Sequence, residues 1–144
     1  MEEFMKAAIE EAKLSLQEGG IPIGAVLVQD RKIIGRGHNR RVQNNDPLAH
    51  AEIECLRNAG RIGSYKNTVL VSTLMPCFMC AGAAVQFGIE RIIVGDSQNF
   101  KGDKAFLEDH WIAVDEWDWY ECMDLMEDFM KKNPDLWKED IGKV

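Results

Sequence analysis

The chain has 144 residues, 46% of them hydrophobic and 28% charged, which is enough for one globular domain with a buried core and too little for two. Its formal net charge of −7, with no dense stripe of Lys and Arg, argues against a nucleic-acid partner and favours a small neutral substrate. No apolar run is long enough to span a bilayer, and the acidic, amphipathic N-terminus is unlike a secretory signal, so we expect a cytoplasmic protein without a membrane partner.

The first part of the chain predicts a helix followed by a hairpin. Residues 2–18 place apolar side chains at intervals of three and four, which is typical of an amphipathic helix, and Gly19 ends it. Residues 21–28 form an almost continuous apolar run, which predicts a buried strand. A turn at residues 30–32 leads into a second strand over residues 33–37.

In the middle of the chain, helices and strands alternate. Asp46 and Pro47 resemble a helix N-cap followed by a first-turn proline, so a second helix is predicted over residues 48–58. β-branched and apolar residues predict a third strand over residues 68–73. A mostly apolar helix is predicted from residue 77 to residue 87.

The last part of the chain adds two strands, two helices and a short tail. Strands are predicted over residues 91–95 and 111–114, and helices over residues 103–109 and 120–132. Residues 133–144 form a final segment that opens with an Asn-Pro pair, which ends the helix before it.

The order of these elements predicts an α/β domain. A hairpin followed by strand–helix–strand crossovers indicates a three-layer α-β-α sandwich with a central five-stranded mixed sheet and helices on both faces. No repeat, low-complexity stretch or linker divides the chain, so residues 1–144 are predicted to form a single domain. In such sheets the active site usually lies where strands end and helices begin.

Three metal-ligating side chains stand at the starts of two predicted helices. His50, Cys77 and Cys80 offer one imidazole and two thiolates, which are ligands that zinc takes in proteins. A structural zinc normally has four protein ligands, whereas a catalytic zinc keeps one position for water. The fourth group here is Glu52, which lies too close to His50 to be a comfortable ligand and is better placed to move a proton. The pattern predicts a zinc hydrolase.

Two other interpretations of the cysteines stay open. A fourth ligand from Cys55, His38 or His110 would make a closed, structural zinc site, which would leave Glu52 unexplained. A thioredoxin-like redox pair would leave both the histidine and the acid without a role. Cys55 and Cys122 are themselves predicted to be small buried apolar residues.

The sequence HAE at residues 50–52, together with PCFMC at residues 76–80, resembles the signature of the cytidine deaminase-like zinc deaminases. This two-part motif is specific to the superfamily but does not separate free bases, nucleosides, nucleotides and tRNA as substrates. Four longer stretches resemble fungal-type cytosine deaminase, namely GGIPIG at residues 19–24, GRGHN at 35–39, GDSQNF at 95–100 and WKEDIG at 137–142.

This resemblance implies an activity and a cofactor. It implies hydrolytic deamination of a free pyrimidine base, cytosine to uracil plus ammonia, by a homodimer with one Zn²⁺ per chain. His50, Cys77 and Cys80 would hold the zinc, and Glu52 would be the catalytic acid and base. We expect residues 133–144 to form a lid that excludes water from the active site.

The resemblance also implies a set of substrate-binding residues, namely Ile23, Asn39, Ala51, Phe100, Trp137 and Asp140. The family residues that match Phe100 and Trp137 pack over the base. The residue that matches Asn39 holds the polar edge of the pyrimidine, and the one that matches Asp140 accepts a hydrogen bond from the exocyclic amine. Ile23 matches an apolar pocket residue.

Two positions depart from the fungal pattern. Ala51 stands where the fungal enzymes have glycine, and Met75, which we also place beside the substrate, stands where a small polar residue is expected. Isocytosine or another amino-pyrimidine or triazine therefore stays open as the substrate. Further alternatives are a guanine deaminase, which shares the HAE form, and a tRNA adenosine deaminase, which the charge of −7 argues against.

Overall fold

The computed structural model describes residues 1–144. The strands are Gly24–Gln29 (β1), Lys32–His38 (β2), Thr68–Ser72 (β3), Arg91–Val94 (β4) and Ala113–Glu116 (β5). They form one sheet in the order β2-β1-β3-β4-β5, in which β1 is antiparallel to both neighbours and β3, β4 and β5 are parallel. The predicted five-stranded mixed sheet is therefore confirmed.

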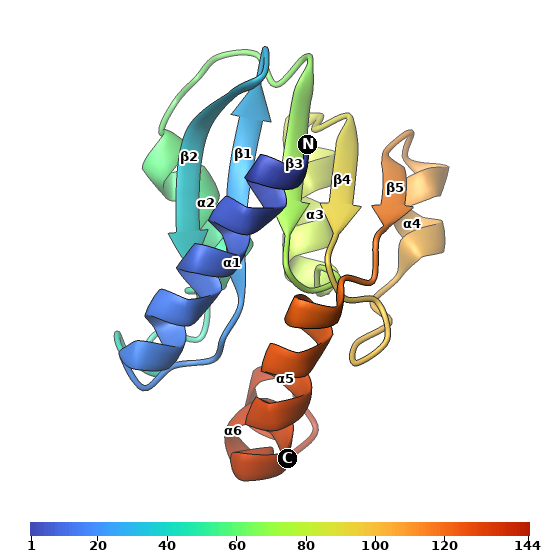
Figure 1. Ribbon diagram of the computed structural model, residues 1–144. Helices are drawn as coiled ribbons and strands as arrows, with labels where there is room; N and C mark the ends of the chain where they lie inside the picture. The colour runs from blue at the N-terminus through green and yellow to red at the C-terminus, as the bar shows by residue number, and fades with distance from the viewer.

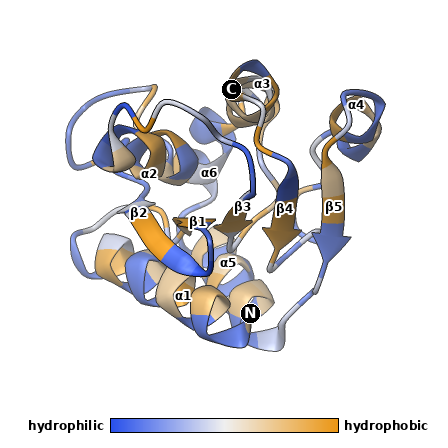
Figure 2. Ribbon diagram, turned by 90° about the horizontal axis from the view of Figure 1, so that it is seen from above, coloured by the Kyte–Doolittle hydropathy of each residue, from blue (hydrophilic) through white to orange (hydrophobic).

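The helices are Glu2–Gln17 (α1), Ala51–Ala59 (α2), Phe78–Phe87 (α3), Lys104–Asp109 (α4), Tyr120–Lys132 (α5) and Pro134–Asp140 (α6). Figure 2 shows α1 and α5 on one face of the sheet and α2, α3 and α4 on the other, which confirms the three layers. α5 and α6 extend beyond the end of the sheet toward which β3 and β4 run (Figure 1). No helix has both the length and the apolar character that a membrane-spanning segment requires.

Because helices cover both faces of the sheet, the central strands are unbroken runs of apolar residues. Val26 and Val28 of β1 belong to the core that packs against α1. Ala25 and Leu27, which alternate with them, belong to the larger core on the opposite face. Because successive side chains of a strand point to opposite faces, a strand covered on both sides is apolar at every position.

The crossing of α1 over β1 depends on a glycine. A Cβ atom at Gly24 would overlap the carbonyl oxygen of Ala8 and lie 2.5 Å from the backbone nitrogen of Ala12. We expect Gly24→Ala to lower the free energy of unfolding by about 3 kcal/mol, because helix backbone would have to move. Urea denaturation measures this loss. Gly82→Ala in α3 is the matched control, since a Cβ there meets nothing within 4 Å, and equal losses would contradict the prediction.

The second helix begins later than predicted. The prediction that Asp46 and Pro47 start it is wrong, because the backbone nitrogen of His50 bonds to the carbonyl oxygen of Leu48 at 2.8 Å and closes a turn instead. The Asp46 carboxylate accepts a hydrogen bond from the Leu48 backbone at 2.9 Å and caps that turn. α2 therefore starts at Ala51, and His50 becomes its N-cap residue.

The fifth strand is also shifted, from the predicted residues 111–114 to 113–116. Trp111 has a φ angle of +69° and a side chain that is 92% exposed, so it belongs to a turn and not to a strand. The Ile112 backbone nitrogen bonds to the carbonyl oxygen of Leu107 at 3.0 Å and closes α4. Trp111 and Ile112 therefore belong to the turn that ends α4 and not to the strand.

Candidate active site

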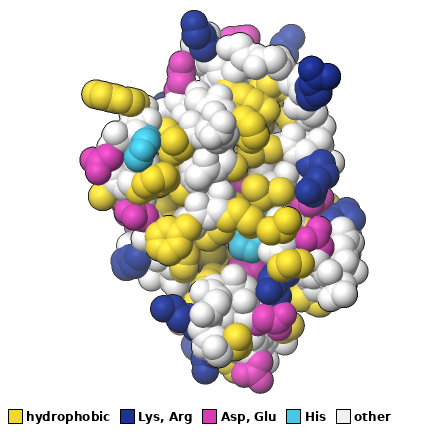
Figure 3. Space-filling view, turned by 180° about the vertical axis from the view of Figure 1, so that it is seen from behind, with side chains coloured by type: hydrophobic (Ala, Val, Ile, Leu, Met, Phe, Trp, Pro, Cys, Tyr) yellow, Lys and Arg dark blue, Asp and Glu magenta, His cyan; other side chains and the backbone are white.

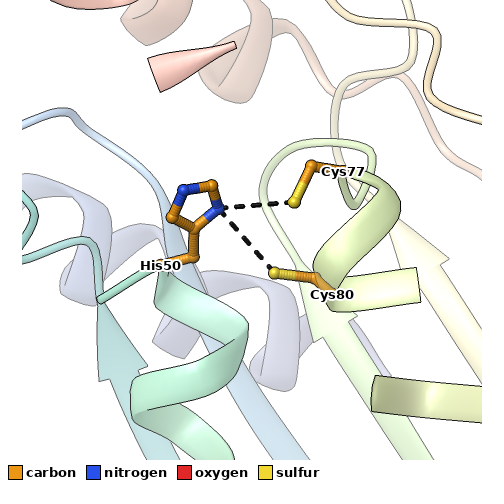
Figure 4. Close-up of side chains that lie close together, drawn as sticks. All are labelled: His50, Cys77 and Cys80. Atoms are coloured by element: carbon orange, nitrogen blue, oxygen red, sulfur yellow. Dashed lines mark hydrogen bonds between the residues drawn. The ribbon is translucent and has the colours of Figure 1, made fainter. Parts of the chain in front are cut away.

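His50, Cys77 and Cys80 lie together where α2 and α3 begin (Figure 4). The Nδ1 atom of His50 is 3.5 Å from the Cys77 sulfur and 3.8 Å from the Cys80 sulfur. A tetrahedral zinc with bonds of about 2.0 Å to nitrogen and 2.3 Å to sulfur would hold such atoms about 3.6 Å apart. The three donors therefore fit one zinc ion.

Backbone conformation turns these side chains toward one another. His50 and Cys77 are the N-cap residues of α2 and α3, both with extended backbone, and neither side chain forms a capping hydrogen bond with its own helix. Cys80 follows in the first turn of α3. The positive ends of both helices thus face the donor atoms and favour thiolate over thiol.

No fourth ligand joins this group. No other His, Cys, Asp or Glu has a ligand atom in the cluster of three. His38 is hydrogen-bonded to Glu11 and Glu18. The His110 ring is hydrogen-bonded to the carbonyl oxygen of Phe106. The Cys55 thiol donates a hydrogen bond to the carbonyl oxygen of Gly35. The closed structural site considered from the sequence therefore lacks its fourth residue.

The charges of the three donors depend on one another. A hydrogen bond from Cys80 and another from His50 lower the pKa of Cys77 to about 4, against the opposing effect of burial. The same contact with Cys77, together with burial, raises the pKa of Cys80 well above its usual range. A divalent cation bound by both sulfurs would favour the thiolate form of each cysteine.

Glu52 is buried beside this group and its side chain lines the same cavity as His50 and Cys77. Burial, reinforced by the negative charge of Cys77, raises its pKa to about 7. A carboxylic acid with a pKa near neutrality can both accept and donate a proton at physiological pH, as general acid–base catalysis requires.

A small cavity adjoins the donors and the acid. Its volume is about 20 Å³, which holds about one water molecule, and α6 forms part of its wall. Its other lining residues are Ile23, Leu74, Met75, Phe100, Trp137, Asp140 and Ile141. The Phe100 and Trp137 rings meet edge to face with centroids 6.0 Å apart. A wider groove of about 500 Å³ leads from the site to the surface, where hydrophobic side chains surround a partly visible histidine (Figure 3).

Five of the residues predicted to bind substrate line this cavity, namely Ile23, Met75, Phe100, Trp137 and Asp140. Asn39 and Ala51 do not line it, although both are fully buried. The Oδ1 atom of Asn39 accepts a hydrogen bond from the Arg41 backbone at 3.0 Å. Its Nδ2 atom and the Oδ1 atom of Asp140 are buried without a hydrogen-bond partner.

Sequence reasoning missed three residues at the site. Leu74 and Ile141 line the cavity, and the Arg41 guanidinium lies 3.7 Å from the Asp140 carboxylate. Leu74 and Ile141 are the chain neighbours of Met75 and Asp140, so adjacency could have found them. No sequence signal distinguishes Arg41 from the basic residues around it.

Comparisons with known proteins agree with this site. Residues 1–96 match the family model described as the cytidine and deoxycytidylate deaminase zinc-binding region. A cytosine deaminase of Candida albicans (strain SC5314 / ATCC MYA-2876) is 39% identical over 142 residues, which cover 96% of this chain and 95% of that protein. A tRNA-specific adenosine deaminase of Buchnera aphidicola subsp. Schizaphis graminum is 43% identical over 115 residues, covering 78% of this chain and 76% of that one.

A solved structure from a study of A-to-I editing by tRNA:A34 deaminases superimposes with a TM-score of 0.78 and 31% identity, covering 87% of this chain and 99% of the other. The family match extends over two thirds of the chain and includes the histidine, the acid and both cysteines. The donor set and the cavity beside it provide what this chemistry requires. The chain therefore belongs to the cytidine deaminase-like zinc deaminases and is a zinc-dependent deaminase with a His/Cys/Cys site for one Zn²⁺.

Proposed function

We propose that the protein deaminates a free pyrimidine base, with cytosine going to uracil plus ammonia. The observation that carries this proposal is the C-terminal helix. Trp137 and Asp140 of α6 complete the cavity wall, and the similarity to the Candida cytosine deaminase extends over 96% of the chain. The similarity to the Buchnera tRNA deaminase covers 78%.

Two unpaired polar atoms support a base as the ligand. A buried polar atom without a partner costs about 1–3 kcal/mol, so a ligand that pairs with it gains that free energy. In our proposal the Asp140 carboxylate accepts from the exocyclic amine, and the Asn39 amide, which lies behind the wall of the cavity, donates to an acceptor on the pyrimidine edge once the cavity has widened around the base. Phe100 and Trp137 would pack over the ring, with Ile23 on the apolar wall.

Glu52 would carry out the proton transfers of the reaction. Zinc held by His50, Cys77 and Cys80 would act as a Lewis acid and lower the pKa of the attacking water. Glu52 would take the proton that this water loses and deliver it to the ring nitrogen. It would then take the proton of the hydroxyl added at the amine-bearing carbon and pass it to the departing amine. The backbone N–H of Ala51 would contact the base edge, since the methyl group leaves this donor in place.

The lid proposal follows from the size of the cavity. A volume of about 20 Å³ is too small for a pyrimidine ring, so residues 133–144 must move outward to admit the base and to release the product. Once closed, α6 keeps bulk water away from the reacting carbon.

A homodimer is proposed from a separate apolar surface. A groove of about 560 Å³ beside α2 and α3 is lined by five hydrophobic residues and by Arg57, Gly60 and Arg61, the hydrophobic ones being Ile53, Leu56, Tyr65, Ala83 and Phe87. Phe87 is 50% exposed there, and burying such a surface against a second copy would remove it from water. Sedimentation equilibrium measures the association. A cytoplasmic location and the absence of a nucleic-acid partner stay predictions from the sequence.

Isocytosine, or another amino-pyrimidine or triazine, is the second candidate. Met75 is buried and lines the cavity, so its thioether narrows the approach to the metal site. The methyl group of Ala51, which a glycine would lack, also narrows the approach to the metal site. A purine such as guanine would need still more room in the closed site, and tRNA would have to approach a chain of net charge −7.

A substrate panel tests the proposed function. Zinc-loaded protein is incubated with cytosine, isocytosine, guanine, cytidine, adenosine and a tRNA substrate, and ammonia release is measured. Turnover of a pyrimidine base supports the proposal, whereas turnover restricted to guanine or tRNA contradicts it. Asp140→Asn is expected to lower kcat/KM about 100-fold, because it removes a charged acceptor. Asp135→Asn on the exposed side of α6 is the matched control.

A further inference from the structure

Arg41 contacts both sides of the proposed substrate site. Its backbone N–H donates to the Oδ1 atom of Asn39 at 3.0 Å. Its guanidinium lies 2.5 Å from Glu139 and 3.7 Å from the Oδ1 atom of Asp140. The Arg41 side chain is 17% exposed and that of Asp140 is 5% exposed, so the contact between these two is shielded from water. One residue thus connects the loop that carries Asn39 with the helix that carries Asp140.

The lid has few other polar attachments. The hydrogen bond from Arg41 to Glu139 is the one side-chain hydrogen bond between α6 and the rest of the chain. Apart from Arg41, the ion-pairing group closest to α6 is His50, whose Nε2 atom lies 3.4 Å from Asp140. Trp137 supplies apolar packing, which holds a helix against the core without fixing the direction of its carboxylates.

The contact with Asp140 is a charge contact and not a hydrogen bond. The Oδ1 atom of Asp140 has no hydrogen-bond partner although the Arg41 Nε atom is 3.7 Å away. The guanidinium, together with the nearer His50 imidazole at 3.4 Å, therefore stabilises the Asp140 carboxylate and leaves a lone pair free to accept from a ligand. Because the Asp140 side chain is 5% exposed, solvent screens this interaction little. Glu139 is 52% exposed, and its pair with Arg41 is screened more.

We infer that Arg41 is a positioning residue for deamination, which aims the Asp140 carboxylate at the exocyclic amine and holds α6 closed over the base. The contact between Asp140 and the exocyclic amine rests on the proposed function, whereas the attachment of α6 by Arg41 does not. A guanidinium can reach two neighbouring carboxylates at once, which a single ammonium does poorly. The role therefore depends on the fork of the arginine and not only on its charge.

The variant Arg41→Gln removes the guanidinium and keeps the backbone N–H that Asn39 uses. We expect kcat/KM for the base to fall about tenfold, chiefly through a higher KM, because substrate binding loses an oriented acceptor. Amide hydrogen exchange in α6 is expected to accelerate about tenfold, because opening of this helix becomes easier. Arg41→Lys is expected to restore part of both effects.

Arg40→Gln is the matched control, since it removes the same charge from the next residue. The charge of Arg40 acts on Glu18, and the ion pairs of Glu139 and Asp140 are with Arg41 and His50. Both KM and α6 exchange in Arg40→Gln should therefore equal those of the unmodified protein. Glu139→Gln should accelerate exchange in α6 while changing KM less than Arg41→Gln does, because Asp140 keeps its partner.

Unchanged α6 exchange in Arg41→Gln would overturn the inference, whatever base the protein turns over. Equal effects of Arg40→Gln and Arg41→Gln would also overturn it, since the cause would then be net charge. Accelerated exchange without any turnover of pyrimidine bases would support the attachment of α6 and would contradict the proposed function alone. The two failures are therefore distinguishable.

Discussion

Replacing Glu52 by glutamine is expected to lower kcat by about 1,000- to 10,000-fold while the zinc content stays at one ion per chain. The amide has the size of the acid but neither takes a proton from water nor returns one to the amine. Glu52 is buried and its pKa is about 7, so the acid is matched to this role at neutral pH. Ammonia release and metal analysis measure the two quantities.

Glu54→Gln is the matched control for this variant. Glu54 lies on the same helix and is also buried, but it pairs with Arg57 and does not line the cavity. We expect its kcat to be unchanged. Loss of zinc from the Glu52→Gln protein would show that the acid holds the metal, and an undiminished kcat would show that it transfers no proton. Either result would contradict the assignment.

Cys77→Ala is expected to abolish both zinc binding and deamination. Removing one of three donors should weaken zinc binding by more than about 100-fold, since even the loss of a residue behind a ligand weakens it by about 10- to 100-fold. A metal at 1,000 times its dissociation constant stabilises the native state by about 4 kcal/mol. The variant should lose this zinc-dependent stabilisation, which thermal unfolding with and without added zinc measures.

Cys122→Ala controls for the loss of a thiol as such. Cys122 is buried, with its sulfur 3.9 Å from the Met5 sulfur and outside the donor group. We expect this variant to keep its zinc and its kcat and to lose about 1 kcal/mol of unfolding free energy, as a small core truncation does. A Cys77→Ala protein that still bound one zinc ion and turned over substrate would contradict the ligand assignment.

Local patterns were enough to predict most of the fold. The helix over residues 120–132 has the bounds that its apolar spacing predicts, and the five-stranded sheet is mixed, as a hairpin followed by crossovers predicts. The predictions failed at three boundaries: the first strand begins at Gly24 and not at residue 21, Asp46 caps a turn, and Trp111 adopts a positive φ. In all three places hydrogen bonds of a turn replaced the element that residue preference favoured.

The sequence by itself determined the chemistry of the site. The histidine, the two cysteines and the acid have types and spacings that few functions other than a zinc-dependent deaminase require. This information lies in short stretches, because the identity of a ligand is a property of the residue itself.

Only the tertiary structure decided what surrounds this chemistry. The ion pair of Arg41 with Asp140 and the place of α6 in the cavity wall each join segments about a hundred residues apart. The burial of the Asn39 amide without a partner depends on the same packing. Periodicity reports which face of an element is buried, but it does not report which distant side chain lies against that face. Contacts of this kind arise from packing of the whole chain, and so they became visible only in the folded protein.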